Sequence, residues 1–144
     1  MFNHIIKLYE LENIEDRILT IDSVTYNDEL CIEIKLIKLD EICPYCSSTL
    51  YKIKDYQKKK ITHTFSNTRK TFIIYYRRRY LCKICNKTFF ENDPFTSTNN
   101  NISTLTVMNI LNYLKDYNHT FSSAAKVYNV SVQSIINIFD KHVD

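Results

Sequence analysis

Two pairs of cysteines in this chain of 144 residues have the spacing of metal ligands. Cys43 and Cys46 form one Cys-x-x-Cys pair, and Cys82 and Cys85 form the other after an interval of 35 residues. Each short loop can turn both of its sulfurs toward one ion, so the two pairs together supply four thiolates for a tetrahedral site. Because four protein ligands leave no open coordination position, the pattern predicts a structural and not a catalytic Zn²⁺.

Disulfide formation and redox chemistry are the alternatives for these cysteines. Disulfides need an oxidising compartment, and residues 1–7 lack the charged-then-apolar order and cleavage site of a signal peptide. A thioredoxin-like dithiol needs one pair inside a βαβ unit, not two separated pairs. We therefore favour zinc, expect a cytoplasmic protein, and interpret the fifth cysteine, Cys31, as a buried core thiol.

The segment between the cysteine pairs is longer than the ~15 to 20 residues common in such sites, which predicts an extra hairpin. Ser47 and Asn86 directly follow the two pairs, at the position where such a loop needs a left-handed backbone. Asparagine tolerates that conformation better than serine does. We interpret His63 as an ordinary strand residue, since four cysteines already satisfy zinc.

Charge is strongly segregated along the chain, although the net charge is only +3. Residues 1–41 hold 4 basic and 10 acidic side chains, whereas residues 52–89 hold 12 basic side chains and only Asp55, a net charge of +11. A field of one sign on a small module is typical of nucleic-acid binders. Because this segment has almost no carboxylates, we expect its basic runs to contact phosphates, with a solvated strand face as the alternative. These runs are Lys58, Lys59, Lys60 and Arg77, Arg78, Arg79.

The first two-thirds of the chain is rich in strand patterns. Two runs, 17–26 and 30–39, are separated by Asn27-Asp28-Glu29 and predict a hairpin. In the second run one face carries Leu30, Ile32, Ile34 and Leu36. Further strands are expected over 50–56, 58–65 and 69–81, with a turn at 66–68, and a short amphipathic helix is expected over 2–10.

The hydrophobic period changes after residues 91–101, which are polar, contain Pro94 and lack periodicity. Beyond them we expect a helix capped by Ser103 or Thr104, with a stripe of Val107, Met108, Leu111 and Leu114. A second helix is capped by Thr120 or Ser122. A third runs from Val132 to about His142, with Ile135, Ile138, Phe139 and His142 facing inward.

The sequence thus predicts an α+β protein with two domains. Residues 1–92 form a β-rich hairpin and four-cysteine zinc-ribbon-like domain, residues 93–101 a linker, and residues 102–144 an all-α three-helix helix-turn-helix domain.

The helix-turn-helix interpretation depends on the residues around the second turn. Ala125 is small where two helices approach, Asn129 accepts a positive φ, and Ser131 can cap the next helix. Any three-helix bundle shares part of this pattern. Candidate DNA contacts on the third helix are Ser131, Gln133, Ser134, Asn137 and Lys141, since glutamine and asparagine suit adenine and lysine suits phosphate.

The order of these motifs resembles the N-terminal half of transposases of the ISL-three insertion-sequence group. The resemblance covers residues 43 to about 142, and its most specific part is the run from Arg78 to Glu91, with Cys82-Lys-Ile-Cys85-Asn-Lys-Thr-Phe-Phe-Glu91. It implies a zinc-binding domain and helix-turn-helix that bind the terminal inverted repeats of a mobile element, in a bacterial, nucleoid-associated protein. It places catalysis in a following RNase H-like domain with three acidic residues, and no such triad can be assigned here.

The expected function is sequence-specific binding of double-stranded DNA by a non-catalytic part of a transposase, with structural Zn²⁺. We also expect a second copy of the chain (a homodimer), or a catalytic domain in cis or trans, as a possible partner. We expect no membrane partner. A stand-alone zinc-ribbon and helix-turn-helix transcriptional regulator, or a zinc-stabilised RNA- or protein-interaction module, are the alternatives.

Overall fold

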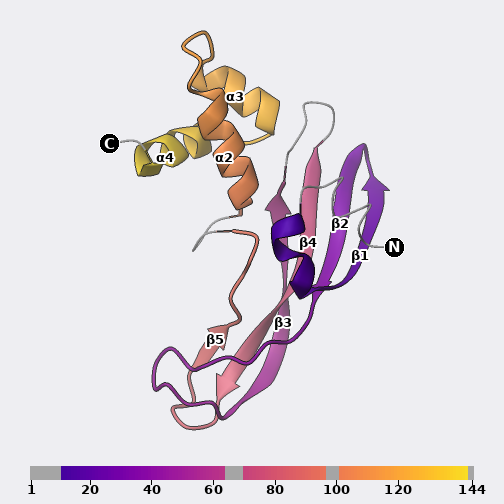
Figure 1. Ribbon diagram of the computed structural model, residues 1–144, viewed down its shortest axis with the longest axis vertical. Coiled ribbons are helices and arrows are strands. Elements are labelled where there is room, and N and C mark those ends of the chain that lie inside the picture. The colour runs from indigo at the N-terminus through magenta and orange to yellow at the C-terminus, as the bar shows by residue number, and fades with distance from the viewer. Residues whose placement is uncertain (1–10, 64–69, 97–100, 143–144) are drawn as a thin grey trace.

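The computed structural model describes residues 11–63, 70–96 and 101–142 and confirms the α+β class. The three helices lie at one end of its long axis, and the two loops that carry the cysteines lie at the opposite end (Figure 1). The helix expected over 2–10 and the turn expected at 66–68 fall outside the described residues. In chain order the elements are η1 (Glu12–Arg17), β1 (Ile18–Tyr26), β2 (Glu29–Leu36), β3 (Tyr51–Thr62), β4 (Thr71–Cys82), β5 (Thr88–Phe90), α2 (Thr104–Tyr113), α3 (Phe121–Tyr128) and α4 (Val132–His142).

The predicted N-terminal hairpin is confirmed, since β1 pairs with β2 in antiparallel fashion. Its two-residue connection places Asn27 and Asp28 at φ values of 48° and 66°. Two successive positive φ angles are the requirement of a type I′ turn, whose twist matches that of the strands it joins. The predicted apolar face of β2 is also confirmed, because Ile32, Ile34 and Leu36 are buried.

The long segment between the cysteine pairs folds into the predicted extra hairpin, β3 and β4. The prediction of separate strands over 50–56 and 58–65 is wrong, because β3 is one strand of 12 residues with an irregularity between Ile53 and Asp55. No glycine or proline interrupts this stretch, and β4 pairs with it from Tyr51 opposite Cys82 to Thr62 opposite Phe72. The long partner strand therefore keeps β3 extended throughout.

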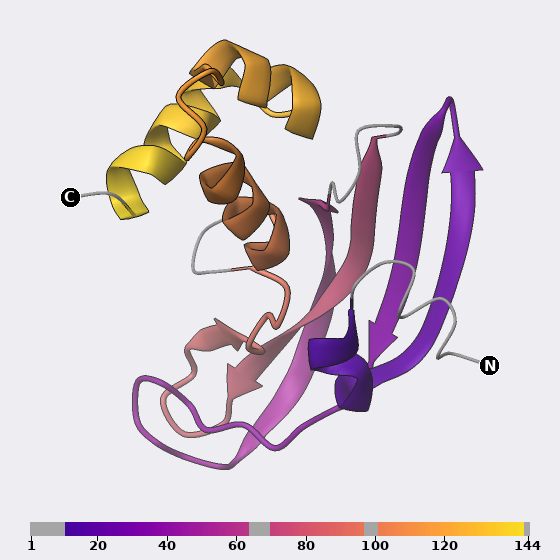
Figure 2. The same cartoon turned by 45° about the horizontal axis from the view of Figure 1, so that its top comes forward.

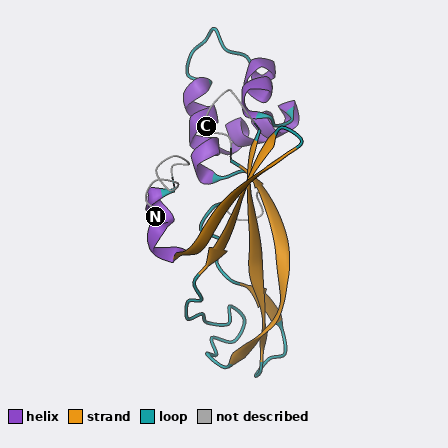
Figure 3. Cartoon of the chain, turned by 90° about the vertical axis from the view of Figure 1, so that its right-hand side faces the viewer, coloured by secondary structure: helices purple, strands orange, loops and turns teal. Residues whose placement is uncertain are grey.

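The sheet has mixed pairing, with the strand order β1-β2-β4-β3. β3 follows one side of β4, while the other side is shared by two strands. β2 pairs in parallel with Thr71 to Tyr75, and β5 pairs in antiparallel fashion with Arg79 to Leu81. β3 is thus an outer edge strand that runs between the cysteine loops and the helices (Figures 1 and 3).

The main core lies on one face of the sheet, against η1 and the segment after β5 (Figure 2). Leu11, the N-cap of η1, and Ile14 within η1 contribute to this core. From the segment after β5, Phe95 packs its ring against that of Tyr75 at a centroid distance of 5.3 Å. Phe95 and Asp93 belong to the predicted linker 93–101, and both are buried. This part of the chain therefore packs on the sheet.

His63 joins the end of the sheet to the helices and is not the ordinary strand residue that the sequence indicates. It is 1% exposed, and its Nδ1 lies 2.8 Å from the hydroxyl of Ser103, the N-cap of α2. The neighbouring Thr62 donates its N–H to the carbonyl of Asn101 and accepts one from Ser103 N. The start of α2 is thereby tied directly to β3.

The helix boundaries follow the predicted caps. Ser103 accepts a hydrogen bond from Thr106 N, Thr120 forms a capping box with Ser123, and Ser131 accepts one from Ser134 N at 3.0 Å. Asn129 has the predicted positive φ, 57°. The helical core consists of Ile102, Val107, Ile110, Ala124, Ile135 and Ile138.

Two inward positions in the helices are predicted wrongly. Met108 is 62% exposed, because the buried stripe of α2 passes instead through Thr106, Val107 and Ile110. Thr106 can be buried since its hydroxyl lies 2.8 Å from that of Ser103. His142 is exposed in the last turn of α4. No helix within the described ranges is long and apolar enough to span a membrane.

Candidate metal centre and basic surface

The two cysteine loops, residues 43–48 and 82–87, share one backbone geometry. In the first, Ser47 N donates to Cys43 O at 2.9 Å, and Cys43 N donates to Ser48 O at 2.9 Å. In the second, Asn86 N and Cys82 O make the equivalent bond at 3.1 Å, and Cys82 N donates to Lys87 O at 2.9 Å. Equivalent hydrogen bonds at equivalent positions give the two loops the same turn.

The left-handed position predicted after each cysteine pair is confirmed. Ser47 has a φ of 61° and Asn86 a φ of 59°. The residue in this conformation follows the second cysteine of each pair, and its backbone N–H closes the loop on the carbonyl of the first cysteine. In an L-residue other than glycine the left-handed conformation costs conformational energy, so both loops hold a mildly unfavourable backbone in order to gather their sulfurs.

The four sulfurs lie within 4.8 Å of one another and can hold a metal ion. The Sγ atoms of Cys43 and Cys85 are 3.7 Å apart, and those of Cys46 and Cys82 are 3.5 Å apart. Four thiolates at the usual zinc–sulfur distance of ~2.3 Å stand about 3.8 Å from one another in a tetrahedron. The observed distances between sulfurs are therefore close to those of a tetrahedral site with four thiolate ligands.

The surroundings of the cluster shift the pKa values of two of its thiols in opposite directions. The backbone N–H groups of Cys85 and Ile84 donate toward Cys82 and lower its thiol pKa to about 6, against the opposing effect of burial. The Ser48 N–H likewise acts to lower the pKa of Cys46, but desolvation and the three neighbouring sulfurs raise it to about 12. A bound cation would oppose the effect of the neighbouring sulfurs on Cys46, as metal binding does for thiolate ligands.

A small aromatic cluster supports the cysteine loops. Cys43 and Cys82 are buried together with Tyr80 and Phe89, and Tyr51 packs against them. The rings of Tyr51 and Tyr80 have centroids 4.7 Å apart. Because this cluster is separate from the main core, the loops depend on few apolar contacts.

Cys31 lies apart from the four-cysteine cluster and is only half-buried, so its interpretation as a buried core thiol is wrong. It sits on the face of β2 opposite Ile32 and Ile34, beside Glu29 and Glu33. The main core covers the other face of the sheet, which leaves the Cys31 side with more solvent contact.

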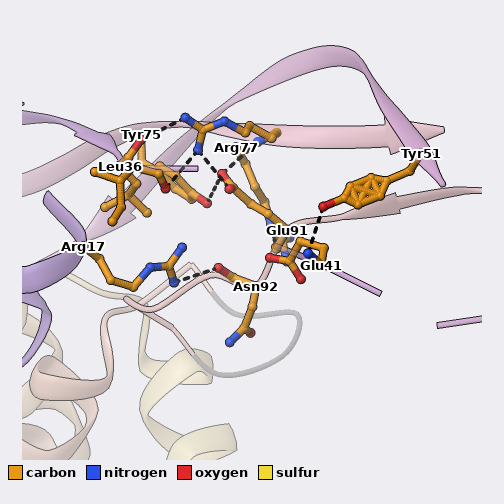
Figure 4. Close-up of polar contacts among 10 residues, drawn as sticks. Arg17, Leu36, Glu41, Tyr51, Tyr75, Arg77, Glu91 and Asn92 are labelled. Carbon is orange, nitrogen blue, oxygen red and sulfur yellow. Dashed lines mark hydrogen bonds and ion pairs between the residues drawn. The ribbon is translucent and has the colours of Figure 1, made fainter. Parts of the chain in front are cut away.

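Arg78 forms an ion pair with a buried carboxylate, so its guanidinium is not available to contact phosphate. Its Nη1 lies 3.1 Å from Glu91 Oε2, its Nη2 donates to Leu36 O at 2.9 Å, and its backbone N donates to Glu91 Oε1 at 3.0 Å. Glu91 is 1% exposed and also accepts the hydroxyl hydrogen of Tyr75 (Figure 4). This pair lies where β2 and β5 meet along the same side of β4.

Two further basic side chains in the predicted runs have carboxylate partners. Arg79 makes a two-point contact with Asp55 on the opposite strand, which lowers the pKa of that carboxyl. Lys59 lies 2.5 Å from Asp93 and 3.0 Å from Thr96 Oγ1. The expected shortage of partners is wrong for Arg78 and Lys59, because Glu91 and Asp93 follow the counted segment in sequence and fold back against it. Arg79 pairs with Asp55, the carboxylate inside that segment.

The remaining basic side chains of the two runs are more available. Arg77 donates from Nε to Glu91 O at 2.9 Å (Figure 4). Its guanidinium also stacks on Phe90, at 4.8 Å from the ring centroid. Lys60 is half exposed and lies 3.5 Å from Glu29. Lys58 is exposed, and the structure pairs no described carboxylate with it. The three contribute to a groove of about 600 Å³ lined also by Gln57, Lys59, Phe90 and Asn101.

The candidate DNA contacts on α4 share one outward surface. Ser131, Gln133, Asn137 and Lys141 are exposed, while Ser134 is half-buried. Gln133 Nε2 donates to Asn137 Oδ1 at 2.9 Å, so these two amides already lie side by side. The sequence analysis missed Gln57, Phe90, Glu91 and Asn101; of these, only Glu91 carried a signal, as the first acidic residue after a long basic segment.

No protein-family model, curated protein or solved structure matches this chain.

Proposed function

We propose that this protein binds double-stranded DNA in a sequence-specific manner, with α4 as the recognition helix and structural Zn²⁺ at the four-cysteine cluster. The observation that carries the proposal is the polar, exposed surface of α4 directly after a tight left-handed turn. A helix-turn-helix presents its second helix to the major groove in this way.

The connection between α3 and α4 supports the proposal of a helix-turn-helix. The carbonyl of Ala125 accepts hydrogen bonds from Asn129 N and from Val130 N, the latter at 3.2 Å. Ala124 and Ile135 are both fully buried, one on each helix. A three-residue turn with apolar residues at the crossing fixes the angle between the helices, so the α4 side chains project as one set.

Base recognition is the role proposed for the adjacent amides of Gln133 and Asn137. Either side chain can make paired hydrogen bonds to adenine in the major groove, while Lys141 in the last turn suits a phosphate. The contact between the two amides orients both before DNA arrives. DNA contact would replace this mutual bond with bonds to base edges.

Zinc is the metal proposed for the cluster, because four thiolates at tetrahedral spacing suit Zn²⁺ better than they suit oxygen-preferring cations. When bound, the ion cross-links the loop before β3 to the loop after β4. The pairing of Tyr51 with Cys82 at that end of the hairpin is then held from both strands. The role proposed for the site is structural, with no open coordination position.

The biological target that we propose is the terminal inverted repeat of an insertion sequence, as the resemblance to ISL-three transposases implies. An operator of a transcriptional regulator is the alternative, and it needs the same DNA-binding parts. Selection of random duplexes by the zinc-loaded protein, followed by sequencing, identifies the preferred site. A motif at the ends of a mobile element supports the transposase role, and a promoter motif supports the regulator.

Changing Gln133 and Asn137 together to alanine is expected to weaken binding to the selected duplex by about 1 to 3 kcal/mol, because the base contacts are lost. Binding to a scrambled duplex should change little, since phosphate contacts remain. Fluorescence anisotropy on both duplexes measures the difference. Asn112→Ala, which removes an exposed amide from α2, is the matched control and should leave both affinities unaltered. Equal losses on the two duplexes for the double variant would rule out base recognition by α4.

A protein-interaction module is the second candidate, favoured by exposed apolar side chains at the cysteine loops. Ile42, Tyr45, Leu50 and Ile84 are 58 to 62% exposed. Apolar side chains gathered in this way mark protein interfaces in other folds. If the zinc-loaded protein retains no duplex in the selection, this candidate replaces DNA binding.

A further inference from the structure

A polar groove lies beside the open edge of the sheet, between the metal end and the helices. Residues 57–60 of β3 form one side, Arg77 and Phe90 come from β4 and β5, and Asn101 lies just before α2. β3 runs along the molecule from the cysteine loops toward α2, and the groove residues 57–60 lie between the two parts that the proposed function uses (Figure 1).

Arg77 is the most precisely placed cation of this groove. The backbone carbonyl of Glu91 accepts its Nε–H, and the ring of Phe90 lies beneath the guanidinium. These two contacts use one donor and one face of the group, and within the described part of the chain its two terminal nitrogens remain for a ligand. A guanidinium fixed in this way loses little further conformational freedom on binding phosphate.

The surrounding charges divide into paired and available groups. Arg78, Arg79 and Lys59 are committed to Glu91, Asp55 and Asp93. Lys58 has no described carboxylate partner, and Lys60 has only a distant one at the surface, where ion pairs contribute little. The pairing of Gln57 with Arg77 places Lys58 and Lys60 on the alternate face of this edge strand, where Glu29 and Glu33 lie, and Lys60 Nζ is 4.1 Å from the ring centroid of Phe72. Both lysines also line the groove at the sheet edge. The available charge in the groove therefore comes from Arg77, with Lys58 and Lys60 added from the edge strand.

We propose that this groove binds the sugar–phosphate backbone of the DNA whose bases α4 recognises, a proposal that rests on the proposed function. Arg77, Lys58 and Lys60 contact phosphates, whereas Lys59, Arg78 and Arg79 only position the strands. Lysines alone on an edge strand also serve to prevent edge-to-edge aggregation. Arg77, however, lies on the inner strand β4 and is held by oriented contacts, which favours a binding site. The amides of Gln57 and Asn101 add donors suited to phosphate oxygens.

The test compares two triple variants with the same loss of charge. The groove variant combines Lys58→Gln, Lys60→Gln and Arg77→Gln. The matched variant combines Lys35→Gln, Lys52→Gln and Lys115→Gln, all exposed and outside the groove. Anisotropy titrations of the zinc-loaded proteins with the selected duplex, from 50 to 300 mM NaCl, give the slope of log Kd against log salt concentration.

The groove variant is expected to flatten this slope by about 2 to 3, because each lost phosphate contact removes ~0.9. Its preference for the selected over the scrambled duplex should persist, since α4 is intact. The matched variant should flatten the slope by less than about 1. Equal slopes for the two variants would overturn the groove proposal while leaving DNA recognition by α4 in place.

Two other outcomes also contradict the groove proposal, and they differ in what they say of the proposed function. If the wild-type protein binds no duplex, DNA recognition and the groove proposal fail together. If a glutamate-rich peptide binds the wild type but not the groove variant, while duplex binding is the same in both, the groove accepts acidic peptides and DNA recognition by α4 stands.

Discussion

Changing Cys82 to serine is expected to abolish stoichiometric metal binding and to unfold the end of the sheet that carries both cysteine loops. Cys82 is fully buried, ends β4 and lies 3.5 Å from Cys46. The aromatic cluster beneath the loops is small, so a metal bound by the four cysteines would supply much of their stability. In peptides with such sites, metal binding contributes ~10 to 16 kcal/mol of apparent free energy. Metal content by mass spectrometry should fall from one ion per chain to none.

The thermal transition provides the second measurement for this variant. The wild-type protein should lose stability on addition of a chelator, whereas Cys82→Ser should have a low transition temperature that the chelator no longer changes. Cys31→Ser is the matched control, since Cys31 lies outside the cluster and should leave metal content and transition unaltered. A Cys82→Ser protein with one tightly bound ion and a wild-type transition would exclude the four-thiolate metal site.

Changing Glu91 to alanine is expected to lower the free energy of unfolding by about 3 to 5 kcal/mol, the usual cost of removing one partner of a buried ion pair. Glu91 is 1% exposed and accepts hydrogen bonds from Tyr75, Arg78 N and Arg78 Nη1. Its loss leaves a guanidinium that is only 15% exposed without a carboxylate. Burial raises the pKa of Tyr75, so that hydroxyl remains a donor and also loses its acceptor. Equilibrium denaturation of the zinc-loaded protein measures the change.

Asp55→Ala is the matched control for the buried pair, because it removes a carboxylate from an arginine at the surface. The carboxylate of Asp55 is 42% exposed, so its loss should destabilise the protein much less than the loss of Glu91 does. Similar losses for the two variants would mean that the Arg78–Glu91 pair contributes no more than a surface ion pair. This result would also return Arg78 to the candidate phosphate contacts.

The metal centre and the groove share the β3–β4 hairpin, which links the proposed structural and binding roles. The proposed ion would fix one end of the hairpin at Tyr51 and Cys82, and the parallel bridge between Thr62 and Ile102 fixes the other. Arg77 and Lys58 lie between these two ends. Metal loss is therefore expected to disturb the groove more than α4, whose helices have a core of their own.

The sequence by itself determined the features that depend on neighbouring residues. The spacing of four cysteines predicted the cluster that can hold a metal, and Ser47, Asn86 and Asn129 were predicted at left-handed positions. The N-terminal hairpin, its apolar face and the caps of all three described helices in residues 101–142 also followed from local patterns. Backbone conformation and side-chain period are set within a few residues, so the sequence shows them directly.

Only the tertiary structure decided which charges are available and how the strands are ordered. Glu91 and Asp93 stand outside the basic segment in sequence, yet they neutralise Arg78 and Lys59, because β5 brings the chain back along β4. The parallel pairing of β2 with β4 and the burial of His63 against Ser103 likewise join residues about 40 positions apart. Such contacts depend on the register of strands that meet only after folding, and a basic run in a sequence cannot show which partners that register supplies.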